Sequence, residues 1–318
     1  TMADIIVGIE IGVKTTEIGF ADLEGKIFEK TQLHSAAYPI FSSFVDAIIG
    51  EIKDVLKVQT TSIFSKAKVK AIGLAAPGAN AIEGTLSQAV NLPWEVDVNL
   101  PEVLEKAFKT VMHIVNDASA VCIAESFYGA CKEVDDCIVI TLGEGVGMGI
   151  IANGKIILGH DGFAGEGGHM IVKEDGRKCG CGRSGCLETY TSNGGLLLTA
   201  EELRRKHAGN SILNDISTLT EKVVYKAVDL NDDLALKIFD ETAEVLALAI
   251  ANIATVTSPE KVVLYGGIAT AGESITKAVN KLLPKYLLFG DKNDLRVSLS
   301  ELHDENAVLL GAIAVTRK

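Results

Sequence analysis

Residues 137–159 read CIVITLGEGVGMGIIANGKIILG and predict two strands joined by a glycine-rich turn, followed by a hairpin. Asn153-Gly154 favours a two-residue hairpin turn, because both central positions of that turn need positive φ. Residues 5–32 repeat this order of strand, glycine turn and hairpin. Their short β-branched runs cover residues 5–11, 15–21 and 26–32. We infer that the chain contains one α/β module twice.

Helical and strand patterns alternate between and after these two stretches. Apolar residues recur at helical spacing over 40–56 and 234–258, and buried strands are predicted at 69–75 and 261–265. This alternation predicts an α/β fold. We expect a smaller N-terminal domain of residues 1–117, a larger domain of residues 118–304, and a last helix at 305–318 that packs back on the first domain.

The composition excludes several classes of protein. With 318 residues, 47% of them hydrophobic, the chain can bury a large core and is not disordered. Asp and Glu (42) exceed Lys and Arg (30) by 12, which disfavours a surface that binds nucleic acid. The apolar stretch 245–259 is shorter than the roughly 18 residues of a membrane span. The chain enters its first strand without a signal-like segment, so we expect a cytoplasmic protein.

One histidine and three closely spaced cysteines form a candidate metal site. His169, Cys179, Cys181 and Cys186 offer an imidazole and three thiolates, a tetrahedral donor set suited to structural Zn²⁺. The alternative is three surface thiols in a glycine-rich turn. The remaining cysteines, Cys122, Cys131 and Cys137, lie in apolar context, and we expect inert core residues rather than a disulfide framework.

Polar residues at a strand end and near the cysteines are candidates for ligand binding. Asn116 and Asp117 follow a predicted strand, where a carboxylate can accept a proton from a substrate hydroxyl. The alternative role for this pair is to cap the next helix. Glu166, His169 and Glu188 flank the cysteine cluster and suit a polyhydroxylated ligand, the alternative being solvated loop polarity.

Three glycine-rich turns follow strands and offer backbone N–H groups to phosphates. They lie at Gly12, at Gly143–Gly147 and at Gly266-Gly267. Each alone is a weak signal, because glycines also make hairpins. Their occurrence in two similar modules predicts a nucleotide bound between the domains.

Taken together, these strings resemble the ROK family of repressors and sugar kinases, a branch of the actin-like ATPase and hexokinase fold. The most specific stretches are GFAGEGGHM at 162–170 and CGCGRSGCLE at 179–188. The resemblance covers essentially the whole chain. It implies two actin-like ATPase (ribonuclease H-like) domains with an interdomain cleft, and a structural zinc held by the histidine and three cysteines.

The resemblance also implies a role for individual residues. Asp117 corresponds to the general base that activates a sugar hydroxyl toward the γ-phosphate of ATP, with Mg²⁺ on the phosphates. The positions implied to bind sugar are Gly78, Asn91, Asn116, Asp117, Glu166, His169 and Glu188. The positions implied to bind nucleotide are Glu10, Gly12, Lys14, Gly143, Glu144, Gly145, Gly266 and Gly267. Family resemblance also favours a homodimer.

Both phosphate loops depart from the family pattern. The first reads Glu10-Ile11-Gly12-Val13-Lys14 where family kinases have Asp-x-Gly-Gly-Thr, and Glu144 replaces a threonine in the second. We expect Val13 to conflict with a conformation that only glycine adopts. The opposite charges of Lys14 and Glu144 predict an ion pair between the two loops.

We therefore expect an ATP-dependent kinase of a hexose or N-acetylhexosamine. The alternative is a sugar-binding pseudokinase or sensor with altered phosphate loops. A DNA-binding repressor is disfavoured because the chain is acidic and begins at the first kinase-like strand. The sugar, the phosphoryl donor and the oligomeric state stay open at this point.

Overall fold

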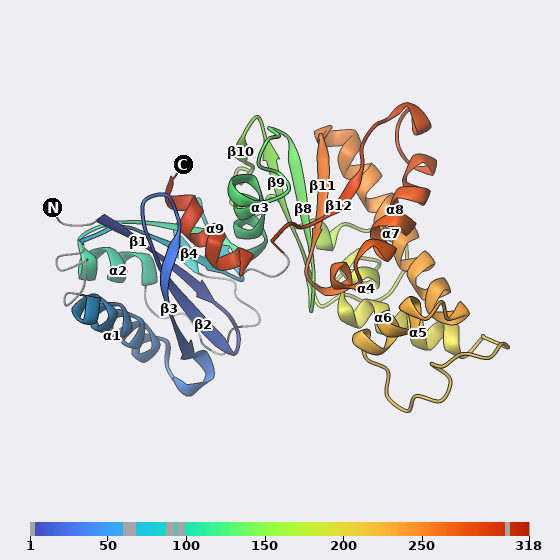
Figure 1. The fold of residues 1–318 in the computed structure, drawn as a ribbon, viewed down its shortest axis with the longest axis horizontal. Helices are drawn as coiled ribbons and strands as arrows, with labels where there is room; N and C mark the ends of the chain where they lie inside the picture. Colours follow the sequence, from blue (N-terminus) through green and yellow to red (C-terminus); the bar gives the residue numbers. More distant parts are fainter. Residues whose placement is uncertain are drawn as a thin grey trace. The chain divides into compact units, whose positions relative to one another are not determined.

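The computed structural model describes residues 4–59, 68–86, 92, 94, 99–302 and 306–317 of the chain. It has the predicted α/β class and divides into two compact units (Figure 1). The first unit consists of Thr1–Phe127, Leu158–Ala164 and Glu305–Lys318. The second consists of Tyr128–Ile157 and Gly165–Asp304. Each unit is built around one five-stranded sheet.

The first sheet combines an antiparallel meander with parallel strands. In spatial order its strands are β3 (Ile27–His34), β2 (Thr15–Ala21), β1 (Asp4–Ile11), β4 (Lys68–Ala76) and β7 (Val111–Asn116). β1 pairs antiparallel with β2 and parallel with β4, which in turn pairs parallel with β7. A short hairpin, β5 (Ala79–Asn80) with β6 (Thr85–Leu86), follows β4.

The second sheet repeats this arrangement. Its strands are, in spatial order, β10 (Lys155–Ile156), β9 (Val146–Ala152), β8 (Cys137–Leu142), β11 (Lys261–Tyr265) and β12 (Val297–Leu299). β8 pairs antiparallel with β9 and parallel with β11, as β1 does with β2 and β4. The hairpin turn at Asn153 and Gly154 has φ of 50° and 70°, which confirms the turn expected from the sequence. The predicted repeat of one module therefore appears as two sheets of the same order.

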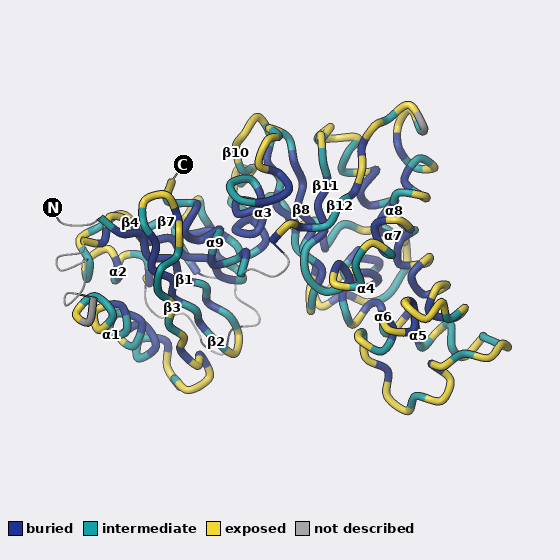
Figure 2. Tube along the Cα trace, in the orientation of Figure 1, coloured by how far each residue is buried: buried dark blue, intermediate teal, exposed yellow. Residues whose placement is uncertain are grey.

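Helices cover the sheets, and the residues between them are buried (Figure 2). The buried residues of each unit form one large apolar core. The helices of the first unit are α1 (Phe41–Gln59), α2 (Leu100–Phe108), α3 (Asp117–Tyr128) and α9 (Ala307–Ala314). Those of the second are α4 (Glu188–Thr191), α5 (Asn193–Arg204), α6 (Glu221–Asp229), α7 (Asp233–Thr257) and α8 (Glu273–Leu282). In the described part of the chain, no helix is both long enough and apolar enough to cross a membrane.

Helix α9 packs on the first sheet because glycines there leave room for its backbone. A Cβ on Gly73 of β4 would lie 1.6 Å from the carbonyl oxygen of Ala312 in α9. A Cβ on Gly311 would likewise lie 1.9 Å from the carbonyl oxygen of Ala120 in α3. This close approach of α3 and α9 keeps α3 in the first unit. The units therefore divide after Phe127, later in the chain than the boundary expected at 117.

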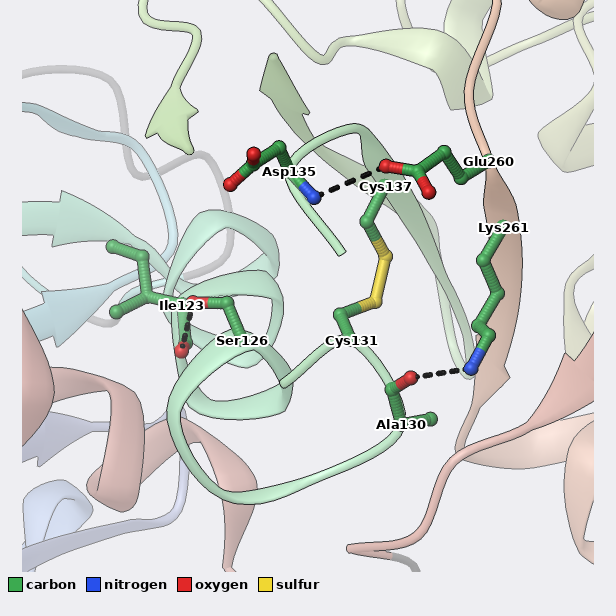
Figure 3. Close-up of a disulfide and its surroundings, with 8 residues drawn as sticks. All are labelled: Ile123, Ser126, Ala130, Cys131, Asp135, Cys137, Glu260 and Lys261. Atoms are coloured by element: carbon green, nitrogen blue, oxygen red, sulfur yellow. Dashed lines mark hydrogen bonds between the residues drawn. A yellow bond between two sulfur atoms is a disulfide. The ribbon is translucent and has the colours of Figure 1, made fainter. Parts of the chain in front are cut away.

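The connection between α3 and β8 contains a disulfide, which corrects the expectation of inert thiols at two positions (Figure 3). Cys131 and Cys137 are both buried, as expected, but they are bonded to each other. Their Cα atoms are 6.2 Å apart, within the range that a disulfide spans. The connection also contacts the start of β11, where Lys261 Nζ donates to the Ala130 carbonyl at 2.7 Å.

Candidate functional site

The four predicted metal ligands come together in the second unit. The ligand atoms of His169, Cys179, Cys181 and Cys186 all lie within 4.8 Å of one another. Isolated bridges from Ile171 to Cys186 and from Lys178 to Ser184 fold the cysteine loop back on itself. One imidazole and three thiols at this spacing form a donor set that fits a tetrahedral metal ion.

The loop favours the thiolate form of Cys181, whereas burial raises the pKa of the Cys186 thiol. Hydrogen bonds from the backbone and the side chain of Arg183 lower the pKa of the Cys181 thiol to about 6. Cys181 is exposed, whereas Cys179 and Cys186 are buried. A thiolate is the ligand and nucleophile form of cysteine.

Two of the predicted sugar contacts of this unit, Glu166 and Glu188, lie next to the candidate metal ligands, and the third, His169, is one of those ligands. His169 Nδ1 lies 3.6 Å from Cys179 Sγ, and His169 Nε2 lies 4.0 Å from Glu166 Oε2. Glu188 Oε1 lies 3.9 Å from Cys179 Sγ. The two ring nitrogens of His169 thus face different groups, one the thiol cluster and the other a carboxylate.

Glu188 and Asn193 link this loop to the second glycine-rich turn, at Gly143–Gly147. Glu188 Oε2 accepts a hydrogen bond from Val146 N at 3.0 Å. Asn193 N donates to the Gly143 carbonyl at 2.8 Å, and Asn193 Nδ2 donates to Glu144 Oε1 at 3.5 Å. Asn193 is not among the residues expected from the sequence. The one available signal was Ser192, a residue type that favours helix N-caps, which marks Asn193 as the first residue of a helix.

The predicted turn at Gly266-Gly267 lies against the same glycine-rich turn. The two glycines have φ of 68° and 43°, and a Cβ on Gly267 would lie 1.7 Å from the Leu142 carbonyl oxygen. The turn that follows β11 thus lies beside the turn that follows β8. Both the conformation and the close approach require glycine.

Asn116 and Asp117 lie in the first unit, at the end of β7 and the start of α3. Asn116 Oδ1 and Asp117 Oδ1 accept hydrogen bonds from Ala118 N at 2.9 and 2.8 Å. The helix-capping role weighed from the sequence is therefore present, and it fixes both side chains. Burial raises the pKa of the Asp117 carboxyl above its ordinary value.

Glu10 faces a second carboxylate that the sequence analysis did not single out. Glu10 of β1 is paired in register with Glu17 of β2, and Asn306 Nδ2 donates to both carboxylates. Burial raises the pKa of Glu10, the Asn306 hydrogen bond opposes this, and the charges of Glu17 and Asp117 add to it. Glu17 and Asn306 lie far apart in the sequence, so no local pattern indicates that they meet at Glu10.

The first glycine-rich turn, between β1 and β2, adopts an ordinary conformation. Gly12 N donates to the Thr15 carbonyl at 2.9 Å, and Ser35 N donates to the Lys14 carbonyl at 3.0 Å. Val13 does not have positive φ, so the turn does not take a glycine-only conformation at this position. Lys14 belongs to the first unit and Glu144 to the second, and their ion pair stays a prediction.

Two of the predicted sugar positions follow β4. Gly78 has φ of 70° in the turn that leaves this strand, a conformation that favours glycine. Asn91 lies outside the described residues.

Comparison with known proteins shows similarity over nearly the whole chain. The sequence profile of the ROK family matches residues 6–318. A glucokinase of Halalkalibacterium halodurans is 33% identical, with 98% of this chain and 95% of the relative covered. A xylose repressor of Caldicellulosiruptor bescii is 27% identical, with 98% of this chain and 77% of the repressor covered.

A solved structure shows the same architecture. The ROK family glucokinase of Streptomyces griseus, in complex with glucose and AMPPNP, aligns with a TM-score of 0.76 at 27% identity. The alignment covers 98% of each chain. The relatives thus include both sugar kinases and repressors.

Proposed function

The chain belongs to the ROK family, and from this premise we propose that it is an ATP-dependent kinase of a hexose or N-acetylhexosamine. The observation that carries the proposal is the fixed Asn116-Asp117 pair at the end of β7. Asp117 accepts the proton of the attacking sugar hydroxyl, and Asn116 holds a sugar hydroxyl. The raised pKa of Asp117 suits a group that must take up a proton during the reaction.

The second unit contributes the remaining sugar and nucleotide contacts in this proposal. Glu166, His169 and Glu188 bind sugar hydroxyls, because carboxylates and imidazole supply the acceptors and donors that such a ligand needs. The turns at Gly143–Gly145 and Gly266-Gly267 receive the nucleotide through their backbone N–H groups. In the first unit, Gly78 and Asn91 shape the sugar pocket, and Glu10, Gly12 and Lys14 face the phosphates. ATP supplies the phosphoryl group, and Mg²⁺ neutralises charge on the phosphates.

We propose Zn²⁺ as the metal of the thiol cluster. Three thiolates and one imidazole are borderline-soft ligands that zinc accepts in tetrahedral geometry. With all four positions supplied by the protein, the ion is structural: it holds the loop that carries His169 and precedes Glu188. Metal analysis of the purified protein tests this assignment.

A coupled assay of ADP release with ATP, Mg²⁺ and a panel of hexoses and N-acetylhexosamines tests the proposed activity. The expected result is turnover with at least one sugar, lost in Asp117→Asn. Absence of turnover with every sugar, together with measurable sugar binding, would support the second candidate, a sugar-binding pseudokinase or sensor. The replacements Glu10, Val13, Lys14 and Glu144 in the two phosphate loops favour that alternative.

A further inference from the structure

Arg177 lies in the loop of residues 169–186 that carries the four candidate metal ligands, called the metal loop below. It uses every hydrogen-bond donor of its guanidinium. Nε donates to Glu202 Oε1 at 3.2 Å, and Nη2 pairs with Glu202 Oε2 at 2.9 Å. Nη1 donates to the carbonyls of Thr189 and Gly195 at 2.8 and 3.0 Å, and Nη2 also reaches Thr199 Oγ1 at 3.0 Å. These contacts account for all five N–H donors of an arginine side chain.

Tyr190 supports the same side chain from another direction. The guanidinium carbon of Arg177 lies 4.6 Å from the centroid of the Tyr190 ring, a cation–π distance. The Arg177 backbone N–H also donates to Tyr190 Oη at 2.9 Å. The Arg177 side chain is only 15% exposed. Its position is therefore fixed by both its backbone and its charge.

The partners of Arg177 belong to one segment, α4 to α5. Thr189 and Tyr190 lie in α4, and Gly195, Thr199 and Glu202 lie in α5. The same segment also contacts the Gly143–Gly147 turn, because Glu188 bonds to Val146 and Asn193 bonds to Gly143 and Glu144. The α4–α5 segment thus makes hydrogen bonds both to Arg177 of the metal loop and to the glycine-rich turn.

We propose that Arg177 is a positioning residue through which the metal loop fixes the Gly143–Gly147 turn. The metal loop then supports the turn expected to bind nucleotide as well as the residues expected to bind sugar. The expected effect on nucleotide binding rests on the proposed function, whereas the expected effect on the position of the turn does not. Lysine cannot replace Arg177, because an ammonium is a point charge and cannot span five acceptors in one plane.

Arg204, the last residue of α5, offers a matched control. Its Nη2 contacts both carboxylate oxygens of Glu201 at 3.0 Å, and its Nη1 donates to the carbonyls of Leu213 and Ile216. It therefore makes charge-assisted contacts of the same kind but holds the segment after α5, rather than the metal loop. Arg204→Lys removes a comparable set of guanidinium hydrogen bonds and leaves the contacts of Arg177 with α4 and α5 in place.

Hydrogen exchange of the full-length zinc-loaded protein tests the proposal without any ligand. We expect Arg177→Lys to raise the exchange rate of peptides covering Gly143–Gly147 by about ten-fold, the scale of one lost charge-assisted hydrogen bond. Arg204→Lys should raise exchange near Leu213 and leave that turn unchanged. An unchanged turn in Arg177→Lys, or an equal effect of Arg204→Lys on it, would overturn the proposal.

Glu202→Gln provides a second test of the proposal if Arg177→Lys does not fold. It retains the arginine and removes the charge of its bidentate partner, so we expect a smaller rise in exchange at the same turn, and no rise would contradict the proposal. Calorimetry with a non-hydrolysable ATP analogue should then show weaker binding in the Arg177 variant. A parent protein that binds no nucleotide would contradict the proposed kinase function, while the exchange data would still decide the role of Arg177.

Discussion

The carboxylate of Glu188 accepts a hydrogen bond from the backbone N–H of Val146 at 3.0 Å. The same side chain lies 3.9 Å from Cys179 Sγ through its other oxygen. One residue therefore contacts both the candidate metal cluster and the glycine-rich turn after β8. A ligand that binds Glu188 would compete with, or reorient, a contact that holds this turn.

Replacing Gly145 by alanine should disturb Glu188 without altering its chemistry. A Cβ on Gly145 would lie 2.9 Å from Glu188 Oε2, so the carboxylate has to move away from Val146. Gly143→Ala is the matched control, because a Cβ there meets no atom within 4 Å among the described residues. We expect Gly145→Ala to weaken sugar binding measured by calorimetry, and Gly143→Ala to leave it unchanged. Equal sugar affinity in both variants would show that the position of Glu188 does not matter.

Asp117→Asn should abolish turnover while sugar affinity changes little. The amide oxygen can still accept the hydrogen bond from Ala118 N, so the start of α3 is retained. The lost general base accounts for a fall in kcat of about 10²- to 10⁴-fold. Asn116→Ala should instead weaken sugar binding. Steady-state kinetics combined with sugar titrations separate the two effects, and normal turnover by Asp117→Asn would remove this residue from the mechanism.

Metal analysis should find one zinc ion bound to each chain, and Cys181→Ala should reduce this content strongly. Because three ligands remain, the variant should lose its zinc faster to a chelator than the parent protein. Cys122→Ala, a buried cysteine of α3 outside the cluster, should retain the metal. Loss of zinc should also weaken sugar binding through His169. Full zinc content in Cys181→Ala would exclude Cys181 as a ligand.

Local patterns in the sequence predicted most of the fold. The longest helix was expected at 234–258 and spans Asp233–Thr257, because its apolar periodicity and its Asp232 N-cap are both local signals. The metal cluster was also predictable, since its spacing and glycines are confined to one loop. Residues that act through distant segments were not: Asn306 contacts Glu10 from the far end of the chain, and no local pattern pairs them.

The disulfide was also not predictable from local sequence, although its two cysteines are close together in the chain. Cys131 and Cys137 are close in sequence, but their apolar surroundings equally describe two buried thiols. Only the path of the chain between α3 and β8 brings their Cα atoms to 6.2 Å. Arg177 was similarly undetected, because two of its acceptors are backbone carbonyls and the side-chain acceptors, Glu202 and Thr199, lie more than 20 positions away in the sequence.

Reducing the Cys131–Cys137 disulfide should lower stability modestly. The cysteines are 6 positions apart, and the chain-entropy account gives about 2 kcal/mol for so short a loop. Urea unfolding with and without reductant measures this difference. The double variant Cys131→Ser and Cys137→Ser should respond to reductant by much less. Peptide mapping under non-reducing conditions that finds two unlinked cysteines would contradict the disulfide.

Activity and stability should depend on pH in opposite directions on the acidic side. Burial raises the pKa of Asp117 above 3.8 and that of Glu10 above 4.5, their ordinary values. A general base works only when ionised, so kcat should rise with pH through the raised pKa of Asp117. A group with a raised pKa holds its proton more tightly in the folded state. Its contribution to stability is therefore full below the ordinary pKa and is lost as pH rises through the raised one.

Glu10→Gln tests the stability half of this prediction. A neutral amide keeps a hydrogen-bond acceptor for Asn306 but cannot ionise, so the variant should lose less unfolding free energy than the parent as pH rises from about 4.5. Urea titrations at a series of pH values compare the two proteins, and the kcat profile of the parent gives the apparent pKa of its acidic limb. Parallel stability profiles would show that Glu10 does not titrate differently on folding. An acidic limb with a midpoint at or below 3.8 would contradict the burial effect on Asp117, because a desolvated carboxylate must lose its proton at higher pH than an exposed one.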